Sequence, residues 1–187
     1  MMTGDLSGSE MFPAEGRVIE NSTTGERIVI RESGRSNGGA LLAFDLFLPP
    51  GSHVPAGHVH PAQDERFTVL SGRMRFRLGR RCIEANAGDT VSVPAGSAHW
   101  FGNDGGELAH ARVEVRPALR MEELLEATAA LGQGPHLPGT HIPAPSRLAV
   151  VLLDYSRELA VPYLPAVLAK LILTPFAWLG RRRHRPD

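Results

Sequence analysis

The chain has 187 residues, with 20 basic and 20 acidic side chains and a formal net charge of zero at pH 7. This length suits one domain with an appendage. The balanced charge gives no broad field that would favour binding to nucleic acid. The single cysteine, Cys82, excludes an internal disulfide framework. Residues 1–16 contain acidic side chains and no apolar core of a secretory signal, so we expect a disordered or loosely held N-terminus and a cytoplasmic protein.

Alternation of apolar and polar residues predicts a mainly β region up to about residue 117. The expected strands cover residues 27–31, 40–48, 65–70, 73–78, 89–93 and 108–115. In the strand 73–78, three arginines alternate with apolar residues, so the arginines are expected on a solvated face. Cys82 follows on the next strand and is expected to be a small buried side chain.

Three histidines and one glutamate indicate a metal site. His58 and His60 are separated by one residue, so on an extended strand both side chains leave the same face. Residues 61–64 break that strand, which lets Glu65 open the next one toward the same point. His99 returns on a later strand. Three imidazoles and a carboxylate suit a divalent transition metal, so these four residues are predicted to bind iron, manganese or nickel, with zinc and copper as alternatives.

These residues resemble the two sequence motifs of the cupin superfamily. The first motif is present as His58, His60, Glu65 and Gly72, and the second as Gly88, Pro94, Gly96, His99 and Asn103. Gly51 lies one residue further from the histidine pair than the pattern expects, which predicts a slightly longer loop. The resemblance covers roughly residues 39–117. It implies a double-stranded β-helix, the jelly-roll barrel of single-domain cupins, which we expect over residues 17–117.

The resemblance leaves several functions open, because cupins include dioxygenases, isomerases, lyases, cyclases and binding proteins. The leading hypothesis is a quercetinase-like dioxygenase, an oxidoreductase that acts on a small organic substrate. Four protein ligands would leave two adjacent positions of an octahedral ion for substrate and dioxygen. Glu65 is the candidate catalytic residue, since a carboxylate that leaves the ion can accept the substrate's proton.

Two alternatives stay open from the sequence. The metal can act as a Lewis acid without oxygen, in an isomerase, lyase or cyclase, or the chain can be a non-enzymatic metal- or ligand-binding cupin. His53 is more simply a loop residue than a substrate contact, and His110 is expected on a polar face of its strand. Apolar side chains are expected to line or fill the interior; they are Phe44, Leu46, Met74, Phe76, Trp100 and Phe101.

Beyond residue 117 the apolar period changes to that of helices, in an extension expected to cover residues 118–187. An amphipathic helix is predicted over residues 119–131, with Gly132 as its stop signal. A proline-rich linker follows. A second helix is predicted over residues 147–159, with Ser146 as its N-cap.

The next segment, residues 161–179, is almost wholly apolar and is followed by an arginine-rich tail. Lys170 near its middle and the prolines Pro162, Pro165 and Pro175 argue against an uninterrupted membrane-spanning helix. We expect these helices to pack on the barrel or on a second protomer in a homodimer, with peripheral contact to anionic lipid as the alternative. The expected partners are therefore a small-molecule substrate and a second copy of the chain.

Overall fold

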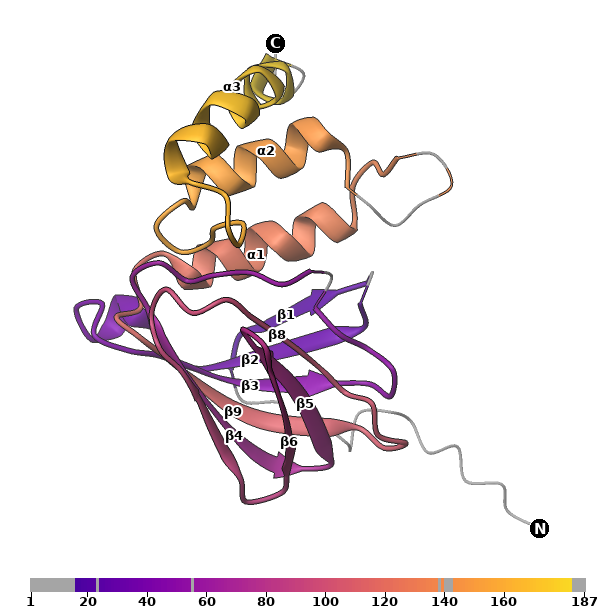
Figure 1. Ribbon diagram of the computed structural model, residues 1–187. Coiled ribbons are helices and arrows are strands. Elements are labelled where there is room, and N and C mark those ends of the chain that lie inside the picture. The colour runs from indigo at the N-terminus through magenta and orange to yellow at the C-terminus, as the bar shows by residue number, and fades with distance from the viewer. Residues whose placement is uncertain (1–15, 23, 55, 138, 140–142, 183–187) are drawn as a thin grey trace.

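The computed structural model describes residues 16–22, 24–54, 56–137, 139 and 143–182. Within this part, strands come first and helices follow (Figure 1). The expected loose N-terminus lies outside the described residues except for Gly16, and so does the tail from residue 183 onward.

The strands form two antiparallel sheets. The larger sheet has the order β1-β2-β3-β9-β4-β7, and the smaller has the order β6-β5-β8. Together they form the mainly β jelly roll that the sequence predicted, although the two sheets do not close into a continuous barrel. A short 3-10 helix, Gly34–Ser36, lies between β2 and β3. In chain order the strands are β1 Val18–Asn21, β2 Glu26–Glu32, β3 Leu42–Leu48, β4 Asp64–Ser71, β5 Arg73–Leu78, β6 Arg81–Asn86, β7 Thr90–Val93, β8 His99–Gly102 and β9 Ala109–Arg116.

The interior between the sheets is filled by apolar side chains. Phe67, Phe76 and Phe101 meet there, with ring centroids 5.0 to 6.1 Å apart. Five of the six apolar residues expected to line or fill the interior are buried, namely Phe44, Leu46, Met74, Phe76 and Phe101. Trp100 is only half-buried. Its indole N–H donates to the Val54 carbonyl oxygen at 2.9 Å.

The prediction that Cys82 is buried is wrong, because this side chain is exposed. On β6 the inward positions belong to Ile83 and Ala85, so the alternation of the strand turns Cys82 outward. The order of the smaller sheet also leaves β6 at an edge. The arginines of β5 do lie outward as predicted, with Met74 and Phe76 buried between them.

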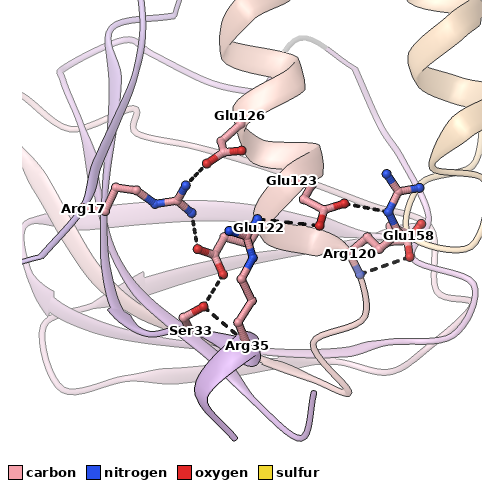
Figure 2. A network of polar contacts seen from close by, with 8 residues as sticks. All are labelled: Arg17, Ser33, Arg35, Arg120, Glu122, Glu123, Glu126 and Glu158. Atoms are coloured by element: carbon pink, nitrogen blue, oxygen red, sulfur yellow. Dashed lines mark hydrogen bonds and ion pairs between the residues drawn. The ribbon is translucent and has the colours of Figure 1, made fainter. Parts of the chain in front are cut away.

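Three helices follow the strands in the chain and are stacked on one side of them, with α3 the farthest from the sheets (Figure 1). They are α1 (Met121–Gly132), α2 (Pro145–Asp154) and α3 (Ala166–Arg182). Polar contacts fix α1 to the strands (Figure 2). Glu122 in its first turn is bound by Arg17, and the Ser33 hydroxyl donates to Glu122 Oε2 at 2.6 Å. Acidic residues at this end of the helix also suit the helix dipole, as predicted.

The start and end of α2 differ from the prediction. Ser146 does not cap this helix, because Pro145 is already its first residue and Ala144 holds the N-cap position without a side-chain bond. Proline is well suited to that first position, where its missing N–H has no intrahelical partner to lose. The helix also ends at Asp154, five residues earlier than expected.

The prolines of the last segment act as expected in part. Pro162 and Pro165 precede α3, but the interruption expected at Pro175 is wrong, since the helix continues through it. The Thr174 hydroxyl donates to the Lys170 carbonyl oxygen at 2.5 Å, within the turn where proline weakens the backbone bonding. The helix packs on α2 and not on the sheets. A Cβ atom at Gly180 would lie 2.6 Å from the Ser146 carbonyl oxygen, so glycine permits this close approach. In the described part of the chain, no helix is both long and apolar enough to cross a membrane.

Asp45 is a buried carboxylate on β3, with only 1% of its surface exposed. The side chains of Arg31 and Arg112 each donate to one of its oxygens at 2.6 Å. Burial alone would raise the pKa of Asp45, but the hydrogen bonds and charges of Arg112 and Arg31 outweigh burial and lower it below its ordinary value. His110 lies on this same polar face, as expected, with Nε2 3.4 Å from Asp45 Oδ1.

Asp45→Asn is expected to lower the free energy of unfolding at pH 7 by about 2 kcal/mol, because two charge-assisted hydrogen bonds lose their anionic acceptor. The native pKa is below the unfolded one, so the carboxylate stabilises the fold at neutral pH and loses this effect as the pH falls through the native pKa. The difference from the wild type should therefore shrink in acid. Urea unfolding at several pH values measures it. Asp104→Asn, at a carboxylate whose side chain is 29% exposed, is the control and should cost about 0.5 kcal/mol or less.

Gly72, between β4 and β5, is expected to be far less replaceable than Gly96. Both have positive φ, +71° and +76°. A Cβ atom at Gly72 would lie 2.7 Å from the Leu108 carbonyl oxygen, whereas one at Gly96 would meet nothing within 4 Å. Gly72→Ala should thus cost about 3 kcal/mol of unfolding free energy and Gly96→Ala about 1 kcal/mol. Chemical denaturation tests this, and equal losses would contradict the clash at Gly72.

Candidate metal centre

The four predicted ligands come from three separate stretches of backbone. Glu65 lies on β4 and His99 on β8. His58 and His60 lie on an extended segment and not on a continuous strand, which corrects the expectation of three strands. Two hydrogen bonds of 2.9 Å join the backbones of His58 and His99, and Gly96 N–H donates to the His60 carbonyl oxygen at 2.9 Å. Because this segment is still extended, its two histidines leave the same face.

The structure brings these four side chains into one cluster. Ligand atoms of His58, His60 and His99 lie within 4.8 Å of one another. Glu65 Oε2 lies 3.0 Å from His99 Nε2 and 3.4 Å from His60 Nε2. His60, Glu65 and His99 are buried, while His58 is half-buried and forms the more open side of the cluster.

Each histidine is oriented by a backbone carbonyl at Nδ1. His58 Nδ1 lies 3.2 Å from the Ala56 oxygen and His99 Nδ1 lies 3.0 Å from the Ser97 oxygen. His60 Nδ1 is bonded to the Glu158 oxygen. A carbonyl can only accept, so Nδ1 carries the proton in each ring and Nε2 keeps its lone pair. Partners of this kind fix the tautomer and the direction of metal-binding histidines.

The charge state of the cluster also suits a cation. Burial, with smaller contributions from His99 and His60, lowers the pKa of His58 to about 3, so this imidazole is neutral at pH 7. Burial alone would raise the pKa of Glu65, but His60 and His99 outweigh it and lower the pKa to about 2. The cluster therefore contains a neutral His58 and an anionic Glu65 under ordinary conditions.

Two buried atoms support the fit of a metal. Glu65 Oε2 and His99 Nε2 face each other, yet neither has a hydrogen-bond partner of adequate geometry. When the His99 ring is neutral and its proton is on Nδ1, both atoms present lone pairs, and a buried polar atom without a partner is costly. A divalent transition ion accepts lone pairs from imidazole nitrogen and carboxylate oxygen together. The residues present thus fit such an ion, and its identity stays a prediction.

The Glu158 carbonyl is a functional group that the sequence did not reveal. It binds His60 from 98 positions further along the chain. The Glu158 side chain is buried and accepts a hydrogen bond from Arg120 N–H at 3.2 Å (Figure 2). Nearby, Val59 and Ala160 exchange two backbone hydrogen bonds, of 3.1 and 2.9 Å. The helical extension therefore supplies part of the support for the cluster, through backbone atoms that leave no side-chain signal in the sequence.

Other polar residues near the motifs take structural positions. Asp64, the last residue of the predicted break before Glu65, accepts a hydrogen bond from Ala95 N–H at 2.8 Å and so stabilises the turn before His99. His53 is exposed and lies beside Trp100, with ring centroids 5.5 Å apart. It does not belong to the cluster, in line with its reading as a loop residue.

A groove of about 910 Å³ includes His99 in its wall, but the His99 side chain is fully buried, so the groove does not open onto the cluster. Trp100, Arg75, Arg77 and Tyr163 also contribute to its wall. Strand alternation turns Arg75 and Arg77 outward from the interior, so this groove follows the outer face of the smaller sheet. It is not lined by the other three members of the cluster.

Residues 45–115 match the family model of the cupin domain. This range contains all four members of the cluster and both sequence motifs. The central part of the chain therefore matches the cupin domain, as the resemblance implied.

Several solved structures are similar to this domain. A predicted oxalate decarboxylase from Thermotoga maritima is 23% identical with a TM-score of 0.49, over 54% of this chain and 90% of its own. A sugar phosphate isomerase from Silicibacter pomeroyi is 21% identical with a TM-score of 0.48, over 55% of this chain and 71% of its own. A DMSP lyase from Ruegeria pomeroyi is 28% identical with a TM-score of 0.39, over 43% of this chain and 40% of its own. No curated protein sequence matches the chain.

Metal retention should depend on the cluster and not on histidine content in general. After dialysis against a weak chelator, His99→Ala is expected to lose nearly all metal, because it loses an imidazole ligand. Glu65→Gln should keep a reduced fraction, since a neutral amide oxygen replaces an anionic one. His110→Ala, outside the cluster, should keep the wild-type amount. Elemental analysis gives the metal content per chain, and circular dichroism checks that each variant is folded. Equal metal content in all three variants would mean that the cluster binds no metal.

Proposed function

We propose that this chain is a metal-dependent cupin enzyme for a small organic substrate, with a quercetinase-like dioxygenase as the first candidate. The observation that supports it is the complete set of three imidazoles and one carboxylate, converging with lone pairs directed at one another. A bound transition ion would supply Lewis acidity and, where it is redox-active, electron transfer between substrate and dioxygen.

In this proposal the protein's own groups hold the ligands rigid and move one proton. The three carbonyl partners at Nδ1 keep each Nε2 directed inward. Glu65 Oε2 is the atom that accepts the proton from the substrate. Because the pKa of Glu65 is lowered, it is a weak base and takes protons best from an acidic group. An enol or a phenol-like hydroxyl therefore suits this site better than a simple alcohol.

The surroundings of the cluster favour a substrate that enters from the side of His58. This is the half-buried member, whereas the interior beyond it is filled by Phe67, Phe76 and Phe101. The phenyl rings exclude water from the inner side of the cluster, and a drier site strengthens the interaction of Glu65 with positive charge. The substrate therefore needs room beside His58 and not deep between the two sheets.

The burial of the cluster also favours a second candidate, a metal-binding cupin without catalytic activity. Three of the four side chains are buried, and apolar side chains pack together between the sheets. In such a protein the ion would stabilise the domain and the position of the extension. The two candidates differ in one measurable property, which is turnover.

Oxygen uptake tests the dioxygenase. The protein is loaded anaerobically with ferrous, manganous or nickel ion, and candidate flavonols and diketones are then added in an oxygen electrode. We expect uptake with at least one metal, a loss of about 100-fold or more in Glu65→Gln, and no change in His110→Ala. Absence of uptake with every metal would overturn the dioxygenase. Substrate consumption that continues without oxygen would instead indicate isomerase, lyase or cyclase chemistry.

A further inference from the structure

The helix α3 exposes a continuous apolar face. It packs on α2 through small residues, of which Ala177 and Gly180 are buried. On its other sides Val167 is 80% exposed and Leu171 is 70% exposed. The apolar face of α3 consists of Val167, Leu168, Leu171, Ile172, Phe176 and Leu179, all exposed. Soluble monomers rarely expose so large a contiguous apolar patch without a partner for it.

Positive charge lies at the end of this face. Arg181 and Arg182 form the last turn of α3, and Arg182 lies over the ring of Trp178 at 3.6 Å from its centroid. Residues 161–182 contain no acidic side chain. Two further arginines, Arg183 and Arg185, follow in the sequence. The surface that fits this helix must therefore be apolar in one part and anionic in the adjacent part.

A groove of about 900 Å³ between α2 and α3 combines the same two properties. Leucines from both sides form much of its wall, among them Leu152, Leu159 and Leu173. Lys170, Arg181 and Arg182 also line it, together with Asp154, which pairs with Arg181 and leaves a net positive lining. Apolar walls next to cationic groups match a phospholipid, whose acyl chains adjoin an anionic phosphate.

The length of α3 favours attachment to a bilayer surface over insertion across it. Its 17 residues correspond to a length of about 26 Å, shorter than the roughly 30 Å of the hydrocarbon layer. Trp178 lies where the apolar face meets the arginines, and tryptophan prefers that boundary in a bilayer. Figure 1 shows α3 at the outer end of the helices, away from the sheets, where a flat surface can reach it.

A second copy of the chain is a poorer fit. In a two-fold symmetric dimer the same patch lies on both sides of the interface. The cations of one copy would therefore face either the cations or the apolar side chains of the other copy. Within residues 161–182 there is no acidic group to receive them. The neighbouring carboxylate, Asp154 on α2, is already paired with Arg181.

We propose that the apolar face of α3 and the cations at its end dock on bilayers that contain anionic phospholipid, which holds the cupin domain at the membrane surface. The apolar side chains enter the boundary between headgroups and acyl chains, and the arginines contact lipid phosphates. This proposal does not depend on the metal or on catalysis.

Vesicle flotation of the full chain tests the docking. Vesicles of equal parts phosphatidylcholine and phosphatidylserine should carry the wild type, and vesicles of phosphatidylcholine alone should carry much less. Leu171→Ser combined with Ile172→Ser should weaken binding by roughly tenfold or more, and Arg182→Gln by about fivefold. Leu70→Ser, at an apolar residue of β4 that is 45% exposed, is the matched control and should bind as the wild type does.

Three outcomes would overturn the proposal. They are no flotation with phosphatidylserine, equal flotation with both kinds of vesicle, and flotation that the double variant does not reduce. Analytical ultracentrifugation of the same proteins tests whether a second copy of the chain, and not lipid, binds the apolar face of α3. A wild-type dimer that becomes monomeric in Leu171→Ser with Ile172→Ser would assign the face to a second copy and not to lipid. Metal content of each variant should equal that of the wild type, which separates this test from that of the metal centre.

Discussion

Glu65 carries a negative charge into a space that it shares with three imidazoles, and the surrounding backbone supplies no hydrogen-bond donor to its Oε2 atom. A carboxylate removed from water is costly unless hydrogen-bond donors or cations meet it. Here the imidazole N–H groups point the other way, to carbonyls at Ala56, Ser97 and Glu158. The donors are thus used to fix the rings, and the lone pairs are left facing inward. This arrangement favours a positive charge in the space that the four side chains share.

The opposite side of the larger sheet shows a different solution to the same problem. Asp45 is as buried as Glu65, but its partners are the fixed charges of Arg31 and Arg112, which belong to the neighbouring strands β2 and β9. Both oxygens of the Asp45 carboxylate have an arginine partner within the protein, so this carboxylate needs no added ion. Asp45 is thus a buried acid that joins neighbouring strands, whereas Glu65 is a buried acid that is suited to bind a cation.

Much of the fold could be predicted because strand alternation reports which face is buried. The six strands predicted with residue ranges differ from the observed ones by at most two residues at either end. The spacing of His58, His60, Glu65 and His99 was enough to predict that their side chains converge. Errors arose where side-chain pattern carries no information. Cys82 was misplaced because residue type was given more weight than strand parity. The helix through Pro175 and the carbonyl of Glu158 depend on tertiary contacts and on backbone atoms, neither of which leaves a periodic signal.

Residues 158–160 belong at once to the support of His60 and to the connection between α2 and α3. A ligand that tightens His60 also restrains this connection, through the Glu158 carbonyl and through the two backbone hydrogen bonds between Val59 and Ala160. By thermodynamic linkage, an ion bound by the histidines and the order of this connection would favour each other to the same extent. The amide hydrogen of Ala160 would then exchange with solvent more slowly when an ion is bound than when none is.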